Sequence, residues 1–153
     1  MFKTSVAKRV VSFAVLIAFV LASWPTAAAA AKGNDRGLEA KWAKLVDVYN
    51  RQALIHNSAP RLVERWLSAH GNDHGKAFAS KKAELLRELA KSNAAWTPVP
   101  YLVMRHNGFD AQGNVVDKAA ARQSIKDLSQ ALKRYTGSTK KLKALIRQFN
   151  LEG

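Results

Sequence analysis

Residues 117–135 read DKAAARQSIKDLSQALKRY, and their apolar members recur at intervals of three and four. This spacing places the apolar side chains on one face of a helix. Asp117 precedes the stripe, where a carboxylate can accept a hydrogen bond from an N–H of the first turn. Gly137 follows it, and glycine is the residue at which helices commonly end. The predicted apolar face consists of Ala121, Ile125, Leu128, Leu132 and Tyr135.

Similar spacing predicts four further helices on either side of this one. Ser58 and either Ser138 or Thr139 are interpreted as N-caps, and Pro60 is tolerated in a first helical turn. Gly71 is expected to end the second helix in a left-handed conformation. The expected helices are Asn34 or Asp35 to about His56, then residues 58–71, 76–91 and 138–149.

Residues 93–116 break the helical spacing and contain two prolines and two glycines. The run Tyr101 to Met104 has the character of an extended segment, and Asn107-Gly108 is typical of a tight turn. The sequence therefore predicts a mainly α protein. We expect a small bundle of about five helices, with an extended or β-hairpin-like insertion between the third and fourth. The alternative is an ordered loop that packs over the bundle.

The N-terminal segment has the three parts of a secretory signal. Basic residues precede the apolar run Val10–Ala22, and the alanine tract Ala27–Ala31 offers small residues for cleavage. An uncleaved membrane anchor is the alternative, although a spanning helix needs about 20 apolar residues. The expected division is a cleavable signal peptide at residues 1–31 and a single basic helical domain at residues 32–153, periplasmic or secreted.

The charge balance favours anionic partners. The chain has 25 basic and 11 acidic residues, and the part from residue 32 onward keeps 22 of the basic residues and all 11 acidic ones. Such an excess attracts an anionic envelope component or an acidic protein, and peripheral membrane contact stays open. Nucleic acid is not expected, because it is scarcer outside the cell than envelope anions. The chain contains no cysteine, which excludes disulfides and thiolate chemistry.

Six basic residues within 15 positions form the predicted binding face, with only Glu152 as an acidic neighbour. A helix of this kind can lie on an anionic membrane or dock on an acidic partner. The alternative is a solvated polar face. The six residues are Lys133, Arg134, Lys140, Lys141, Lys143 and Arg147.

A second predicted contact site involves Trp96 and Tyr101, which lie beside Pro98 and Pro100. Aromatic and proline-rich edges often bind peptides or glycans. The alternative is that both aromatic rings pack into the fold.

The segment 70–74 combines two imidazoles and a carboxylate, His70, Asp73 and His74, which are ligand types that suit zinc or copper. Gly71 and Asn72 stand between them, so the regular geometry of a helix is not expected. The alternative is that Asp73 caps the next helix and both histidines are exposed. No other cofactor is expected.

No glutamate has neighbours that mark it as a catalytic acid, and the pair His106-Asn107, which occurs in nucleases, is also explained as part of a turn. We therefore expect an exported, non-catalytic binding or accessory protein of the bacterial cell envelope, acting through its basic helical face. The alternative is a small secreted hydrolase or toxin that acts on peptidoglycan or nucleic acid.

Overall fold

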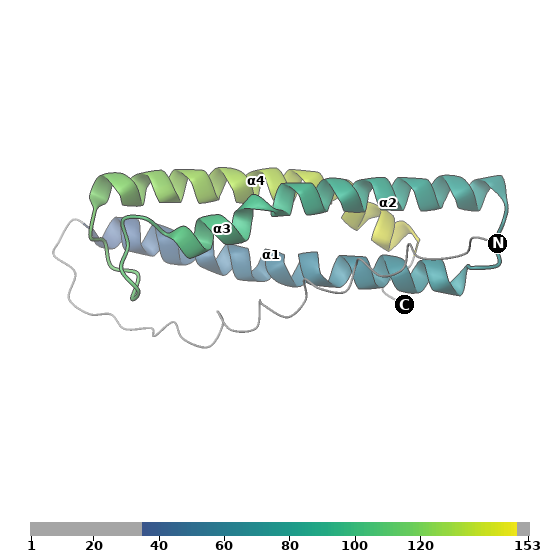
Figure 1. Ribbon diagram of the computed structural model, residues 1–153, viewed down its shortest axis with the longest axis horizontal. Helices are drawn as coiled ribbons and strands as arrows, with labels where there is room; N and C mark the ends of the chain where they lie inside the picture. The colour runs from purple at the N-terminus through teal and green to yellow at the C-terminus, as the bar shows by residue number, and fades with distance from the viewer. Residues whose placement is uncertain (1–34, 150–153) are drawn as a thin grey trace, which may run out of the picture. The chain divides into compact units, whose positions relative to one another are not determined.

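The computed structural model describes residues 35–149, which belong to one compact unit (Figure 1). The predicted signal peptide lies outside the described residues. The prediction of a mainly α fold is confirmed. No helix in the described part is both long enough and apolar enough to span a membrane. The helices are α1 (Arg36–Ala69), α2 (Lys76–Trp96), α3 (Pro98–Arg105) and α4 (Lys118–Gln148).

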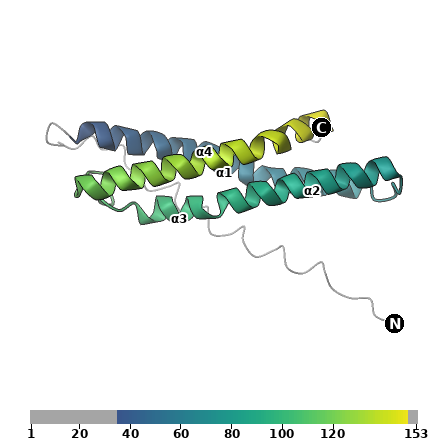
Figure 2. The same cartoon turned by 90° about the horizontal axis from the view of Figure 1, so that it is seen from above.

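The helices pack lengthwise, with α4 in contact with the other three. The α2–α3 segment runs antiparallel to both α1 and α4, as Figures 1 and 2 show. One buried cluster, around Trp42, Trp96 and Tyr135, joins all four helices. A second cluster, around Val63, Leu85 and Leu142, joins α1, α2 and α4 nearer the α1–α2 connection.

The predicted break of the first helix at residues 57 and 58 is wrong, because α1 continues through Pro60. Proline removes one backbone hydrogen bond and costs about 3 kcal/mol inside a helix. The buried residues Ala53, Ala59 and Val63 lie before and after Pro60 and form one continuous inner face of α1. Burial of this face offsets the cost. Ser58 is not an N-cap, since its hydroxyl donates to the carbonyl of Ile55 at 3.1 Å.

The predicted break at Gly137 is also wrong, so the expected count of five helices does not hold. Ser138 and Thr139 lie inside α4 and donate their hydroxyls to the carbonyls of Arg134 and Tyr135, each at 2.9 Å. Neither is an N-cap. The inner face of α4 continues past Gly137, because Thr139, Leu142, Leu145 and Ile146 are all buried.

The α1–α2 connection differs from the prediction at both of its ends. α1 ends at Ala69 with His70 as its C-cap, and Gly71 is not among the described glycines with positive φ. Gly75 is the N-cap residue of α2, without a side-chain cap, so Asp73 does not cap this helix. α2 continues past residue 91 because Trp96 is buried on its inner face.

The expected extended segment at residues 101–104 is helical, and no β-hairpin is present in the described part. Tyr101 to Met104 lies inside α3, which places Val99 and Val103 on one buried face. Prolines in the first turn of a helix do not interrupt it, because those N–H groups have no helical partner.

The predicted tight turn at Asn107-Gly108 is present, with the amide of Phe109 donating to the carbonyl of His106 at 3.1 Å. Gly108 and Gly113 have φ of 87° and 85°, and one isolated antiparallel bridge joins Phe109 to Val115 on either side of Gly113. Asp117 caps α4 as predicted, because its carboxylate accepts from the amides of the second and third helical residues at 2.8 and 3.1 Å.

Candidate functional site

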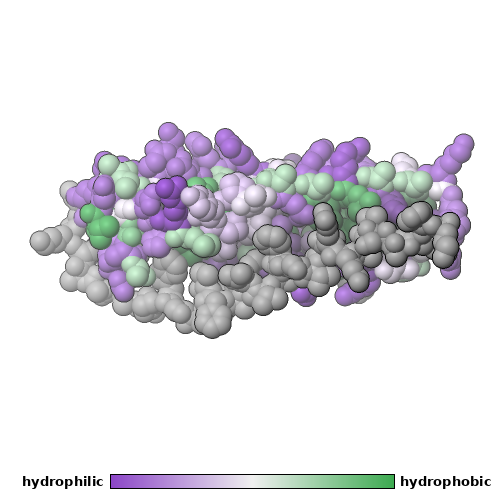
Figure 3. Space-filling model, in the orientation of Figure 1, coloured by the Kyte–Doolittle hydropathy of each residue, from purple (hydrophilic) through white to green (hydrophobic). Residues whose placement is uncertain are grey.

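Because α4 is one continuous helix, it carries all six residues of the predicted basic face. The helix carries nine basic residues and one acidic residue, Asp127. Its large apolar side chains are buried against the other helices. In Figure 3 hydrophilic residues follow the upper edge of the molecule, where α4 and α2 lie in Figure 1. A helix with this division presents a cationic surface to solvent.

The most regular feature of that surface is a line of four cations, Lys126, Lys133, Lys140 and Arg147, which we call the cation row. Its members are exposed and stand seven residues apart. Seven residues make nearly two helical turns, so neighbouring members are about 10.5 Å apart along one side of the helix. Arg122 extends the same side by one turn. Lys126 is absent from the predicted face, although it stands seven residues before Lys133 in the same predicted helix.

The cation row has no acidic partner among residues 35–149, whereas two other cations of α4 do. Lys141 pairs with Glu84 of α2 at 2.8 Å, and Lys118 pairs with Asp35 at 3.0 Å. Lys143 is half-buried. Of the six predicted binding residues, three therefore belong to the cation row, Lys141 joins two helices, and Lys143 is partly withdrawn from the surface.

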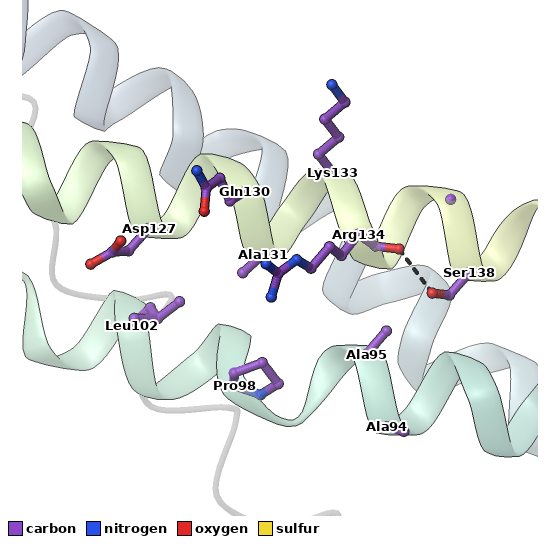
Figure 4. Close-up of a pocket in the computed structure, with 11 residues that line it drawn as sticks. Ala94, Ala95, Pro98, Leu102, Asp127, Gln130, Ala131, Lys133, Arg134 and Ser138 are labelled. Atoms are coloured by element: carbon purple, nitrogen blue, oxygen red, sulfur yellow. Dashed lines mark hydrogen bonds between the residues drawn. The ribbon is translucent and has the colours of Figure 1, made fainter.

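Arg134, the sixth residue, lies in a groove between α4 and the α2–α3 segment, which we call the α4 groove. Figure 4 shows its side chain extending between the helices, whereas Lys133 points away from them. The groove has a volume of about 790 Å³. The residues that line it are Ala94, Ala95, Pro98, Leu102, Asp127, Gln130, Ala131, Lys133, Arg134, Gly137 and Ser138.

The predicted contact site at Trp96 and Tyr101 is not formed. Trp96 is only 4% exposed, and its ring stacks on Tyr49 of α1 and lies 4.7 Å from Tyr135 of α4 between ring centroids. Its position next to the prolines suggested an exposed contact site. Because α2 continues as far as Trp96, the ring lies in the core instead. Tyr101 is 56% exposed and packs with the guanidinium of Arg105.

The three residues of the predicted metal site are not brought together. In the described part no three His, Asp or Glu side chains are close enough to hold a metal ion. The Nδ1 atom of His70 lies 2.9 Å from the carbonyl oxygen of Trp66. Asp73 and His74 are exposed in the connection. His70 and Asp73 line a second hollow of about 330 Å³, which is walled by aromatic rings.

Glu88 is a buried acidic residue of α2. Its side chain is only 4% exposed and accepts from Lys91 Nζ at 3.0 Å and from Arg87 Nε at 3.3 Å. The hydrogen bond from Lys91, more than any other interaction, lowers the pKa of this carboxyl. Two ion pairs within α2, Glu84–Arg87 and Glu88–Lys91, each join residues three positions apart. The neighbouring Glu84–Lys141 pair connects this charged cluster to α4.

Comparisons with models of protein families, with curated proteins and with solved structures found no match to this chain.

Proposed function

We propose that this protein is an exported, non-catalytic binding protein of the bacterial cell envelope, and that it engages an anionic partner through the cation row of α4. One observation carries the proposal: four exposed cations repeat along one side of a helix with no acidic partner among the described residues. Like charges gathered on one face repel one another and lower the stability of the folded state. A bound anion removes that repulsion.

The rest of the basic surface supports a role for this face in particular. Arg51 of α1 is paired with Asp47, and Arg87 of α2 is paired with Glu84 and Glu88. These pairs neutralise part of the charge on α1 and α2, where other exposed cations such as Lys41 and Lys44 have no acidic partner among residues 35–149. An unpaired line of charges about 30 Å long keeps a positive potential that reaches about 8–10 Å into solution at physiological salt.

The carboxylate of Glu88 supports a non-catalytic interpretation. A general acid needs access to its substrate. This group is instead covered and engaged by two neighbouring cations of its own helix. The ion pairs account for Glu88 as a structural residue of α2, and the neighbouring Glu84–Lys141 pair joins this helix to α4.

The proposal is tested by reversing charge along the row. The variant Lys133→Glu, Lys140→Glu, Arg147→Glu should bind vesicles rich in phosphatidylglycerol and soluble polyglutamate about tenfold more weakly than the wild type at low salt. The matched control reverses Lys41, Lys44 and Arg61, which are exposed on α1. The control should retain affinity within about threefold. Equal losses in both variants would mean that net charge, and not the cation row, determines binding.

Export by a cleaved signal peptide is tested by a separate measurement. N-terminal sequencing of the protein recovered from the bacterial periplasm should begin at Lys32, because cleavage is expected after the alanine tract. A protein that keeps Met1 and stays with the membrane would contradict export by a cleaved signal.

A further inference from the structure

We infer that the second hollow, at the α1–α2 end of the bundle, binds a neutral sugar ring. We call this site the aromatic hollow. This inference goes beyond the proposed function, because no member of the cation row lines the hollow. The residues that line it are Trp66, His70, Asp73, Phe78, Lys81, Gln148 and Phe149.

The wall of the aromatic hollow is built from the ends of three helices. Trp66 lies in the last turn of α1, Phe78 lies in the first turn of α2, and Phe149 is the C-cap residue of α4. The ring of Trp66 stacks on both phenylalanines, with centroid distances of 5.3 Å to Phe78 and 5.7 Å to Phe149. The volume of the hollow is about 330 Å³, whereas ligand sites range from about 300 to 1,000 Å³. A hollow of this size and lining suits a single ring with an apolar face.

The rim of the hollow offers hydrogen-bonding groups of both kinds. The carboxylate of Asp73 accepts, the ammonium of Lys81 donates, and the amide of Gln148 does both. The Nδ1 atom of His70 lies 2.9 Å from a carbonyl oxygen, which can only accept, so Nδ1 carries the proton. The other nitrogen of the neutral imidazole is therefore an acceptor. Hydroxyl groups, which both donate and accept, match such a rim.

The two charged residues of the lining disfavour an ionic ligand. The Nζ atom of Lys81 lies 5.3 Å from the centroid of the Phe149 ring, which is the position that a cationic ligand would take on that ring. The same ammonium would repel a cation elsewhere in the hollow. Asp73 is the other charged residue of the lining and would repel an anion. The two charges balance, so a neutral ligand with polar groups at its edge is favoured.

A sugar ring combines an apolar face with a polar edge. When its hydroxyls are equatorial, as in glucose, both faces carry only C–H groups, which pack on aromatic rings, and the hydroxyls extend from the edge toward the rim. A flat aromatic molecule would cover the wall without using the rim. An aromatic amino acid, with its ammonium on Asp73 and its carboxylate on Lys81, is the alternative that the experiment below distinguishes.

Phe78 is the wall residue that the fold explains least. Trp66 and Phe149 also pack against the second buried cluster, whereas Phe78 is not among the described residues of either cluster or of its surroundings. The ring of Phe78 is half-buried, and its ring contacts are with Trp66 and His70, which both line the hollow. Phe78 therefore contributes to the wall of the hollow more than to the core.

The test compares three forms of one sugar that differ in charge, by recording the backbone amide spectrum of the protein during titration. N-acetylglucosamine is neutral, glucosamine is a cation and N-acetylglucosamine 6-phosphate is an anion, and phenylalanine serves as the amino acid. Phe78→Ala removes a ring of the wall, and Asp73→Asn changes an exposed group of the rim without touching the core. Tyr101→Ala removes an exposed ring outside the hollow and is the matched control. A fourth variant, Lys126→Glu with Lys133→Glu, reports on the cation row, and circular dichroism verifies that each variant keeps its helices.

We expect N-acetylglucosamine to bind the wild type with a Kd of about 1 mM and to shift the amides of Trp66, Phe78 and Phe149 most. Both charged forms should bind at least about threefold more weakly. Phe78→Ala should lose about tenfold in affinity and Asp73→Asn about threefold. The Tyr101→Ala and cation-row variants should keep their affinity within about twofold, because their substitutions lie outside the hollow.

The absence of shifts with N-acetylglucosamine at about 50 mM would overturn this inference and leave the proposed function standing. Tighter binding of a charged form, or of phenylalanine, would overturn it in favour of an ionic ligand or an amino acid. Shifts that persist at full strength in both Phe78→Ala and Asp73→Asn would show that the sugar binds elsewhere. Loss of sugar binding in the cation-row variant would overturn the inference by placing the sugar on α4.

Discussion

His56 occupies the centre of the fold as a neutral base. Its ring stacks on Trp96 of α2 with centroids 5.0 Å apart and meets the edge of Tyr135 of α4 at 6.1 Å. The Nδ1 atom is closed from solvent and makes no hydrogen bond within the described part. Burial lowers the pKa of this imidazole below its ordinary value of 6.5. The imidazole of His56 therefore binds a proton at a lower pH in the folded protein than in the unfolded chain.

Replacing His56 should change how stability depends on pH. As the pH falls below about 6.5, the unfolded chain binds a proton before the folded state does, so the free energy of unfolding decreases by at most about 1.4 kcal/mol per pH unit. The variant His56→Phe keeps a ring against Trp96 and should lack this decrease when unfolded with urea between pH 7 and 5. His74→Asn, at an exposed site, should retain it. Parallel profiles for the wild type and His56→Phe would contradict this assignment.

Glu88 should stabilise the protein at neutral pH and cease to do so in acid. Its pKa is lowered chiefly by the hydrogen bond from Lys91, so its contribution is present above the unfolded pKa of about 4.3 and is lost as the pH falls through the folded pKa. Glu88→Gln should be less stable than the wild type at pH 7, and the difference should shrink below pH 4. Glu64→Gln, an exposed change on α1, is the control and should have little effect. A Glu88→Gln deficit that persists at low pH would point to lost packing instead of lost charge.

At the scale of the helices, the two described glycines that matter most should respond in opposite ways. Gly137→Ala should raise the free energy of unfolding by about 0.5–1 kcal/mol, because the position is exposed, helical and open. Gly108→Ala should lower it by more than 1 kcal/mol, since φ is +87° and the added carbon would overlap the backbone of α4 near Ala121. Urea unfolding of both variants measures this contrast. A destabilising Gly137→Ala would show that the groove floor is needed by the fold itself.

The sequence was informative about which faces are buried and less informative about where helices end. The apolar stripe of residues 121–135 and the cap at Asp117 were predicted and are present. Pro60 and Gly137 are local signals for a helix end, but both stand between buried residues that continue the same face. The gain from burying that face, about 1.5–3 kcal/mol for each large side chain, exceeds the local preference. Only tertiary contacts reveal this balance.

The residues of the candidate site were likewise predicted only in part. Lys133, Lys140 and Arg147 were predicted as binding residues and lie on the exposed side of α4. Lys126 was missed, and the row of four is complete only when α4 continues past Gly137 to include Lys140 and Arg147. Trp96 was misplaced at the surface for a related reason, since its burial depends on the longer α2. No local pattern distinguished Glu88 from exposed glutamates, because its burial arises from packing between helices.

At the scale of the whole molecule, the distribution of the positive charge over the surface matters as well as the net charge. The net charge of +14 alone would attract any polyanion without preference. On α4 four exposed, unpaired cations repeat along one side, whereas part of the charge on α1 and α2 is neutralised by ion pairs. We therefore expect anions to bind at the cation row and not over the whole surface.

The most direct test is to map where an anion binds, by recording the backbone amide spectrum of the isotope-labelled protein during titration with polyglutamate. We expect the largest shifts on α4 at Lys126, Lys133, Lys140 and Arg147, with smaller changes on α1. The shifts should fade together as salt rises from about 50 to 300 mM, because added ions screen exposed charges. Shifts spread evenly over all helices, or centred on α1, would contradict a binding face at the cation row.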